Sequence, residues 1–373
     1  MDSFSGAGPL SESTLLYFLL HLGSVFGIFL FSIRLVKWWL WPVLNQLDQS
    51  RGVSSGLFIA SIAWLIGLSI RAVVGLYVFI GGLAPEIAIV ITSVVAIGGL
   101  WGFQLLNDIN VRLWQKVRKK LTSEGIFFVP IFLVLVCFGI MIFVPSDQWD
   151  SSVKYVTNAK YFANGWNAQN LPDTLSTSAD KILEISDAQS ILGIGDTQFV
   201  LFLRWMNIVA MAMAAYSFMR LVNVSARWAA LTTAGVLLSP ELTRLGVSGK
   251  LDGTIAAIEI GAATLLMLAW YVRFELKSGN HYLVLVLLAF ALSLLSAAGR
   301  LSGMYIVSIT GLSLLFLVLS ANVSLRNKYS ILSISCVLFV IFSGLYLFMF
   351  PEGFSAQQSF QELQRNYSIQ QFP

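Results

Sequence analysis

The sequence has few of the residues from which soluble catalytic centres are built. Its 373 residues include two cysteines, two histidines and 11% charged residues, against roughly 25% charged residues in soluble domains. Cys137 and Cys336 each lie inside an apolar run, so we expect neither a disulfide framework nor a cysteine-based metal site. The sequence contains no P-loop, GxSxG or HExxH motif. These absences exclude the commonest soluble enzyme classes.

Apolar residues dominate instead, at 57% of the chain and a mean hydropathy of +0.78. A water-soluble fold of this size could not bury so much apolar surface, so we predict an all-α polytopic membrane protein. A span needs about 20 apolar residues. About ten runs meet or approach that length, and they lie near residues 14–40, 56–83, 86–106, 126–144, 198–219, 226–238, 253–272, 282–297, 302–320 and 331–350.

The first 13 residues lack the basic region and cleavage site of a signal peptide. We therefore expect the first apolar run to remain in the protein as a span.

The distribution of basic residues predicts the orientation. Of the 23 Lys and Arg residues, 14 fall on the side that carries 112–120, and Arg71 and Arg204 fall inside spans. The other seven fall on the opposite side: Lys154, Lys160, Lys181, Arg244, Lys250, Arg300 and Arg365. The positive-inside rule places the first side in the cytoplasm and both termini outside. Because the positive charge sits in short loops between spans, the sequence pI near 9.0 does not indicate nucleic-acid binding.

The pattern predicts two parts, 1–122 with three helices and 123–373 with seven. The second part contains one long polar insertion, 145–197, on the non-cytoplasmic side. Residues 151–166, SSVKYVTNAKYFANGW, have apolar residues at helical spacing and several aromatic side chains. This pattern favours a short helix that lies in the membrane interface.

Three charged residues at the outer ends of predicted spans are candidates for chemistry. Asp150 follows the fourth span, Asp252 begins the seventh, and Arg300 lies in a tight break between two spans. Each also has a structural interpretation. Asp is a favoured helix cap, and Arg300 could reach lipid headgroups as well as a phosphate ligand.

Two arginines fall within apolar runs, where charges are rare and mark functional sites by default. We favour structural roles for both. Arg204 lies close enough to the outer surface to reach it or to pair with an acid of the long loop. Arg71 has Glu86 or a neighbouring subunit as expected partners.

From about residue 126 the order of these features resembles the GT-C membrane glycosyltransferases. The stretch WDSSVKYVTNAKYFANGW looks like the first outer loop of that family, which opens with an acid and continues into an in-plane helix. SPELTRLGVSGKLDGTIAAIEIGAATLLM is similar to a later family stretch, in which a polar run leads through Asp into a helix. GRLSGMYIV resembles the family's turn of a basic residue followed by glycine. The resemblance implies a seven-helix core preceded here by three extra helices.

The resemblance also implies a function, which is transfer of a sugar from a polyprenyl-phosphate donor at the outer face of a bacterial inner membrane. Asp150 would be the general base, and Tyr155 would help to desolvate it. Asp252 would orient a sugar hydroxyl or hold a divalent cation such as Mg²⁺ or Mn²⁺. Arg300, with Lys250 and Arg244, would balance charge on the leaving phosphate. We expect Asp150, Asp252 and Arg300 to line one outward-facing cavity.

A non-catalytic subunit of a membrane complex is the main alternative. The long loop has no tight pair of acids, and small residues such as Gly81–Gly82 and Gly98–Gly99 offer surfaces on which the N-terminal helices could pack against protein partners. A transporter is a third candidate, but the sequence shows no symmetric pair of interrupted helices.

Overall fold

The structure is a computed structural model that describes residues 12–50, 55–81, 83, 85–100, 127–140, 183, 186, 187, 190, 198–239, 252–276, 280–299 and 303–349. Each regular element within these ranges is a helix, which confirms the all-α prediction. Six helices in these ranges are long and apolar enough to cross a membrane: Leu19–Lys37, Gly56–Phe79, Phe199–Leu221, Asp252–Leu276, His281–Ala298 and Leu325–Ser343. The chain is therefore a multi-pass membrane protein by length and composition of its helices, and the count of ten spans stays a prediction.

The helix bounds follow the apolar runs closely. They are α1 Glu12–Ser50, α2 Ser55–Ile80, α3 Pro85–Leu100, an unlabelled helix Phe127–Ile140, α8 Gln198–Leu221, α9 Ala226–Leu237, α11 Asp252–Tyr271 with a π-helical end η3 Val272–Leu276, α12 His281–Gly299, α13 Met304–Leu319 and α14 Leu325–Met349. α1 continues past the predicted end of its span, and α14 begins before its predicted start. Hydropathy measures the lipid-crossing part of a helix, whereas backbone hydrogen bonding can continue into the polar flanks.

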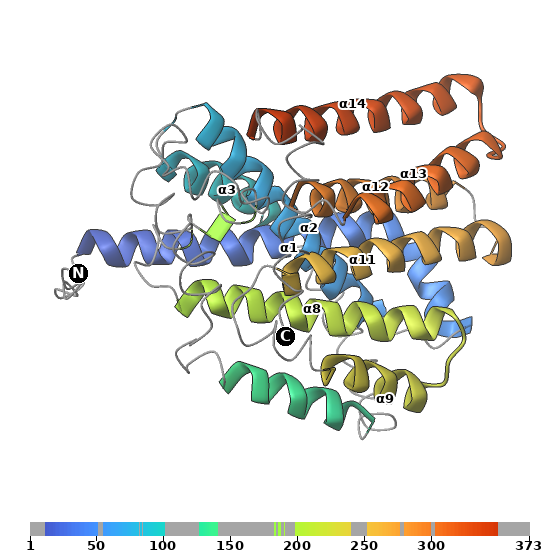
Figure 1. Cartoon of the computed structure of the whole chain (residues 1–373), viewed down its shortest axis with the longest axis horizontal. Coiled ribbons are helices and arrows are strands. Elements are labelled where there is room, and N and C mark those ends of the chain that lie inside the picture. Colours follow the sequence, from blue (N-terminus) through green and yellow to red (C-terminus); the bar gives the residue numbers. More distant parts are fainter. Residues whose placement is uncertain are drawn as a thin grey trace, which may run out of the picture.

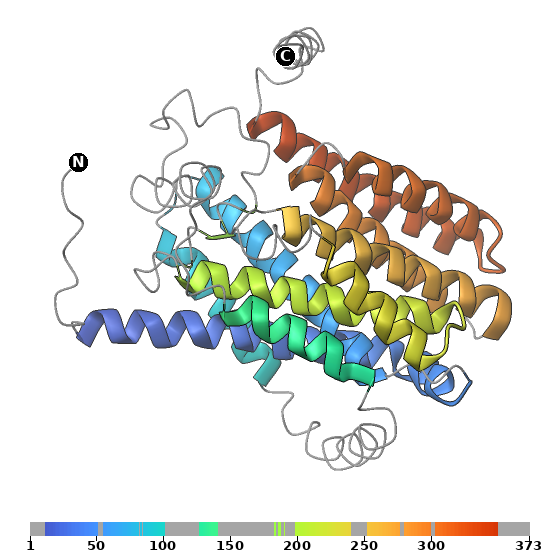
Figure 2. The ribbon, with the colours of Figure 1, turned by 60° about the horizontal axis from the view of Figure 1, so that its bottom comes forward.

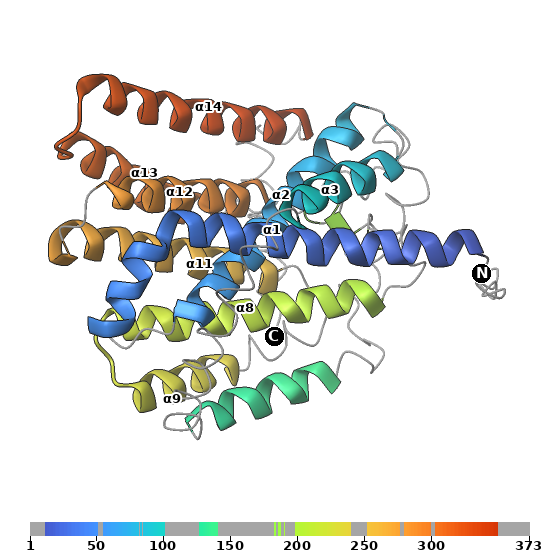
Figure 3. The ribbon, with the colours of Figure 1, turned by 180° about the vertical axis from the view of Figure 1, so that it is seen from behind.

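The helices form a bundle in which α8, α11, α12, α13 and α14 succeed one another across the view of Figure 1. α1, α2 and α3 lie together on one face, with α1 in front in Figure 3. The helix Phe127–Ile140 lies beside α8, as Figure 2 shows, and the Trp205 indole N–H of α8 donates to the Leu135 carbonyl oxygen at 2.9 Å.

Helices α11 and α12 form the centre of the bundle. Each has 67% of its most apolar window buried inside the protein, whereas α14 has 6%. α11 carries apolar residues around its whole circumference, as expected for a helix surrounded by other helices. α14 exposes apolar side chains on the outside of the bundle, where lipid or another protein would cover them.

The ends of the helices alternate along the bundle. α1, α8 and α11 begin at the left of Figure 1, and α12 and α14 end there. Asp252, the first residue of α11, is therefore at the same end of the bundle as the start of α8, to which the 145–197 segment leads.

Candidate functional site

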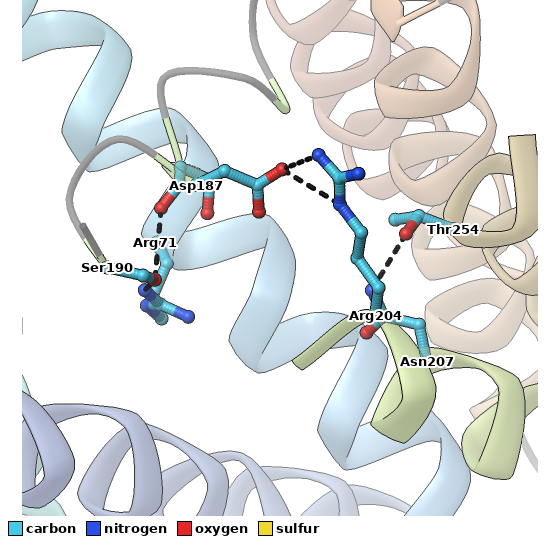
Figure 4. Close-up of polar contacts among 7 residues, drawn as sticks. Arg71, Asp187, Ser190, Arg204, Asn207 and Thr254 are labelled. Carbon is cyan, nitrogen blue, oxygen red and sulfur yellow. Dashed lines mark hydrogen bonds and ion pairs between the residues drawn. The ribbon is translucent and has the colours of Figure 1, made fainter. Parts of the chain in front are cut away.

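Near the start of α8, a buried polar cluster links the 145–197 segment to two spans (Figure 4). The Arg204 guanidinium of α8 donates from Nε at 3.1 Å and from Nη2 at 2.5 Å to Asp187 Oδ2. The Arg71 Nη2 of α2 donates to Ser190 Oγ at 3.0 Å, and Ser190 Oγ donates to the Ser186 carbonyl at 3.5 Å. Ser190 is thus fastened to α2 and Asp187 to α8.

The charges of this cluster are almost fully removed from solvent. Arg71, Arg204 and Asp187 are 4%, 5% and 7% exposed. Burial raises the pKa of the Asp187 carboxyl, while the guanidinium groups of Arg204 and Arg71 oppose that rise. An ionised Asp187 held by two hydrogen bonds offsets the desolvation of Arg204, which a lone buried cation could not tolerate.

A second polar bridge connects α2, α8 and α11. The Trp64 indole N–H donates to Asn207 Oδ1 at 2.7 Å, and Asn207 Nδ2 donates to Thr254 Oγ1 at 2.9 Å. Asn207 and Thr254 are 3% and 3% exposed, so these amide and hydroxyl groups satisfy one another within the bundle. Thr254 lies in the first turn of α11, two residues after Asp252. The bridge therefore fixes the start of α11 against α8.

A small cleft opens between α1, α2 and α8, next to both bridges. Arg71 and Asn207 supply its polar atoms, and Val25, Phe29 and Leu203 are among its apolar walls. Its empty volume is about 280 Å³, a figure that includes space open to the surroundings. The space that the centre of a water molecule can occupy is about 20 Å³, which is room for about one water molecule.

Only one of the residues predicted to carry chemistry lies in the part of the chain that the structure describes. Asp252 is partly buried at the start of α11. Asp150, Tyr155, Arg244, Lys250 and Arg300 lie outside the described residues, as does the predicted in-plane helix 151–166. In the sequence, Arg300 lies between the end of α12 at Gly299 and the start of α13 at Met304.

Sequence reasoning found the two buried arginines and only part of their surroundings. The expected pairing of Arg204 with an acid of the long loop is confirmed, with Asp187 as the acid. Arg71 bonds to Ser190, which we did not predict, and the side chain of Glu86, its expected partner, lies outside the described part of the structure. The Trp64–Asn207–Thr254 bridge was missed, although a polar Asn207 one turn from Arg204 in an apolar run was a usable signal.

Glu259, an acid inside the seventh apolar run, also has a partner in the bundle. Its Oε1 accepts a hydrogen bond from Ser296 Oγ of α12 at 2.9 Å. This contact accounts for an acid at that depth between two central helices.

Comparisons with known proteins gave no relative for this chain: no family model, no curated protein and no solved structure matches it.

Proposed function

We propose that the protein is a GT-C-like membrane glycosyltransferase that transfers a sugar from a polyprenyl-phosphate donor at the outer face of a bacterial inner membrane. The observation that best supports this proposal is the position of Asp252. It begins α11 at the end of the bundle where α8 also begins, and Asp187 and Ser190 of the 145–197 segment bond to α8 and α2 near that end. A loop acid and a helix-end acid on one face are what the proposed chemistry requires.

In this proposal Asp150 accepts the proton of the acceptor hydroxyl as its oxygen attacks the anomeric carbon. The bond from that carbon to the donor phosphate oxygen breaks, and the phosphate leaves with the electron pair. Arg300, Lys250 and Arg244 balance the charge that develops on the phosphate. Asp252 orients a sugar hydroxyl. In the alternative role Asp252 helps to hold a divalent cation such as Mg²⁺ or Mn²⁺.

The test is a transfer assay with full-length protein in membrane vesicles and a panel of radiolabelled polyprenyl-phosphate sugars. Asp150→Asn keeps the shape of the side chain but is a far weaker base, so we expect transfer to fall by at least about 10²-fold. Asp147→Asn, three residues earlier in the same loop, is the matched control and should keep activity. If Asp150→Asn transfers sugar at the wild-type rate, Asp150 is not the base. If the wild type transfers none of the sugars in the panel, the assignment to this class of enzyme fails.

A second candidate function is a non-catalytic subunit of a membrane complex, and α14 is the observation that favours it. Val337 and Val340 are 56% and 66% exposed on a helix that is 6% buried. A photoreactive residue at position 340 distinguishes a protein neighbour from lipid. Crosslinking to a single defined protein together with absent transfer would support the subunit, whereas crosslinking to lipid alone would remove this argument.

A further inference from the structure

Glu259 is a carboxylate inside a membrane-spanning helix to which the proposed reaction gives no role. It lies in the candidate span Asp252–Leu276, seven residues after Asp252. Its Oε1 accepts the hydrogen bond from Ser296 of α12. Among the residues that the structure describes, no donor bonds to its Oε2, which is also not one of the fully buried atoms. A carboxylate can accept several hydrogen bonds, so Oε2 can take a further donor.

The side of α11 that carries Glu259 is less buried than the rest of the helix. Partly buried residues recur along it at helical spacing, and we call them the α11 row: Asp252, Ala256, Glu259, Ala263, Met267 and Trp270. Every other residue of α11 except Ile260 is buried. Acids within spans almost always face the bundle interior or water rather than lipid. The open side of the α11 row around Glu259 is therefore suited to water or to a polar ligand.

The carboxylate of Glu259 lies near the end of the bundle at which α11 begins. Its partner Ser296 is three residues before the end of α12, which at 1.5 Å per residue is roughly 4.5 Å below that end. A Cβ atom on Gly303 would come within 2.6 Å of Ser296 Oγ, so the chain just before α13 packs directly against this turn of α12. Ser296 thus touches both Glu259 and the connection that carries Arg300 in the sequence.

Helix α13 covers the α11 row at its other end. The Trp270 ring stacks on Phe316 of α13, with ring centroids 5.5 Å apart and planes 10° apart. Between the two acids the row carries Ala256, whose methyl group leaves more room than a larger side chain would. A ligand that follows the row from the outer end therefore meets Asp252 and then Glu259, and the stacked rings lie beyond them.

We propose that Glu259 binds a hydroxyl group of the sugar on the polyprenyl-phosphate donor and so helps to select that sugar. This role rests on the proposed glycosyl transfer and adds a residue to its site. The sugar hydroxyl donates to Oε2 while Ser296 holds Oε1, and Asp252 binds another hydroxyl of the same sugar. Hydrogen bonds to a charged acceptor are roughly twice as strong as neutral ones. A donor without the matching hydroxyl leaves the carboxylate oxygen unpaired and is rejected.

The experiment measures binding without transfer, on the full-length protein in a neutral detergent. The probes are polyprenyl-phosphate glucose, mannose and arabinose, each compared with the same polyprenyl phosphate without a sugar. We expect the wild type to bind at least one sugar-linked lipid about 10-fold or more tightly than the sugar-free lipid. Glu259→Gln removes the charge at nearly the same size, so it should abolish most of this preference and leave binding of the sugar-free lipid unchanged. Glu275→Gln, which removes an exposed acid at the far end of the same span, is the control and should bind like the wild type.

Ala256→Leu fills the side of α11 between the two acids without changing charge, so it should also lower the preference and decides the question if Glu259→Gln does not fold. The role of Glu259 is overturned if its Gln variant keeps the wild-type preference or loses affinity equally for both lipids. It is also overturned if the wild type binds both lipids equally. If such a protein still transfers sugar, the proposed function stands and this role alone fails. A wild type that neither binds these lipids nor transfers sugar refutes both.

Discussion

Replacing Asp187 by Asn is the most direct test of how the 145–197 segment is attached to the bundle. The change keeps the size of the side chain and one acceptor oxygen, but it removes the negative charge that faces Arg204 Nε and Nη2. Both partners are more than nine-tenths buried, so Arg204 would be left as a buried cation without a counterion. Breaking a buried pair from one side costs about 3–5 kcal/mol. Because the amide oxygen of Asn can still accept a hydrogen bond from Arg204, we expect a loss of unfolding free energy near the lower limit, at about 3 kcal/mol.

The assay is equilibrium unfolding of the purified protein in mixed detergent, followed by tryptophan fluorescence. Arg204→Gln should destabilise the protein in the same way, because Asp187 then lacks its partner. The loss of unfolding free energy in the double variant should be smaller than the sum of the losses in the two single variants by about 1 kcal/mol or more. Wild-type stability of Asp187→Asn, or strictly additive effects in the double variant, would refute the claim that this pair fastens the segment to α8.

Three further predictions concern packing and orientation. Trp64→Phe removes the indole donor to Asn207 Oδ1 and should cost about 1 kcal/mol in the same unfolding assay; an unchanged stability would mean that the bridge adds nothing. Gly27→Val places a side chain against Ala96 of α3 and should cost about 1–3 kcal/mol through overpacking, whereas Gly98→Ala, whose added methyl meets open space, should be neutral. In a background without Cys137 and Cys336, an impermeant thiol reagent applied to whole cells should label Leu83→Cys and leave Ser225→Cys unlabelled until the membrane is opened; the reverse pattern would invert the topology.

The helices could be predicted because few backbone conformations are stable in lipid. A chain segment in hydrocarbon must satisfy its own backbone hydrogen bonds, so a long apolar run becomes a helix. The starts of α8 at Gln198 and α9 at Ala226 fall where the apolar runs begin. The same rule says nothing about which helix packs against which. The central position of α11 and the exposed position of α14 appear only in the structure.

The buried charges could be found in the sequence, but their partners could be named only by class. Arg204 needed an acid within reach, and the long loop contains several. Asp187 is 17 residues away in sequence, and Ser190 is 119 residues from Arg71. A hydropathy pattern carries no information on contacts between distant polar residues. Each polar residue only lowers the mean hydropathy of the apolar segment in which it lies. Asn207 was overlooked for a related reason, because a neutral amide lowers the hydropathy of a span much less than an arginine does.

The boundary that the sequence places near residue 123 marks a change in composition, and the two parts are nevertheless joined by specific polar contacts. Trp64 of α2 donates to Asn207 of α8, and Arg71 of α2 donates to Ser190 of the 145–197 segment. Contacts of this kind in membranes average about 0.6 kcal/mol, so two of them cannot account for the stability of the interface. Their directionality instead fixes how α2 is rotated against α8, because a rotation of either helix would leave a buried donor without its acceptor. The N-terminal helices are thereby held in one register on the bundle, and Arg71 is held among the residues that line the cleft between α1, α2 and α8.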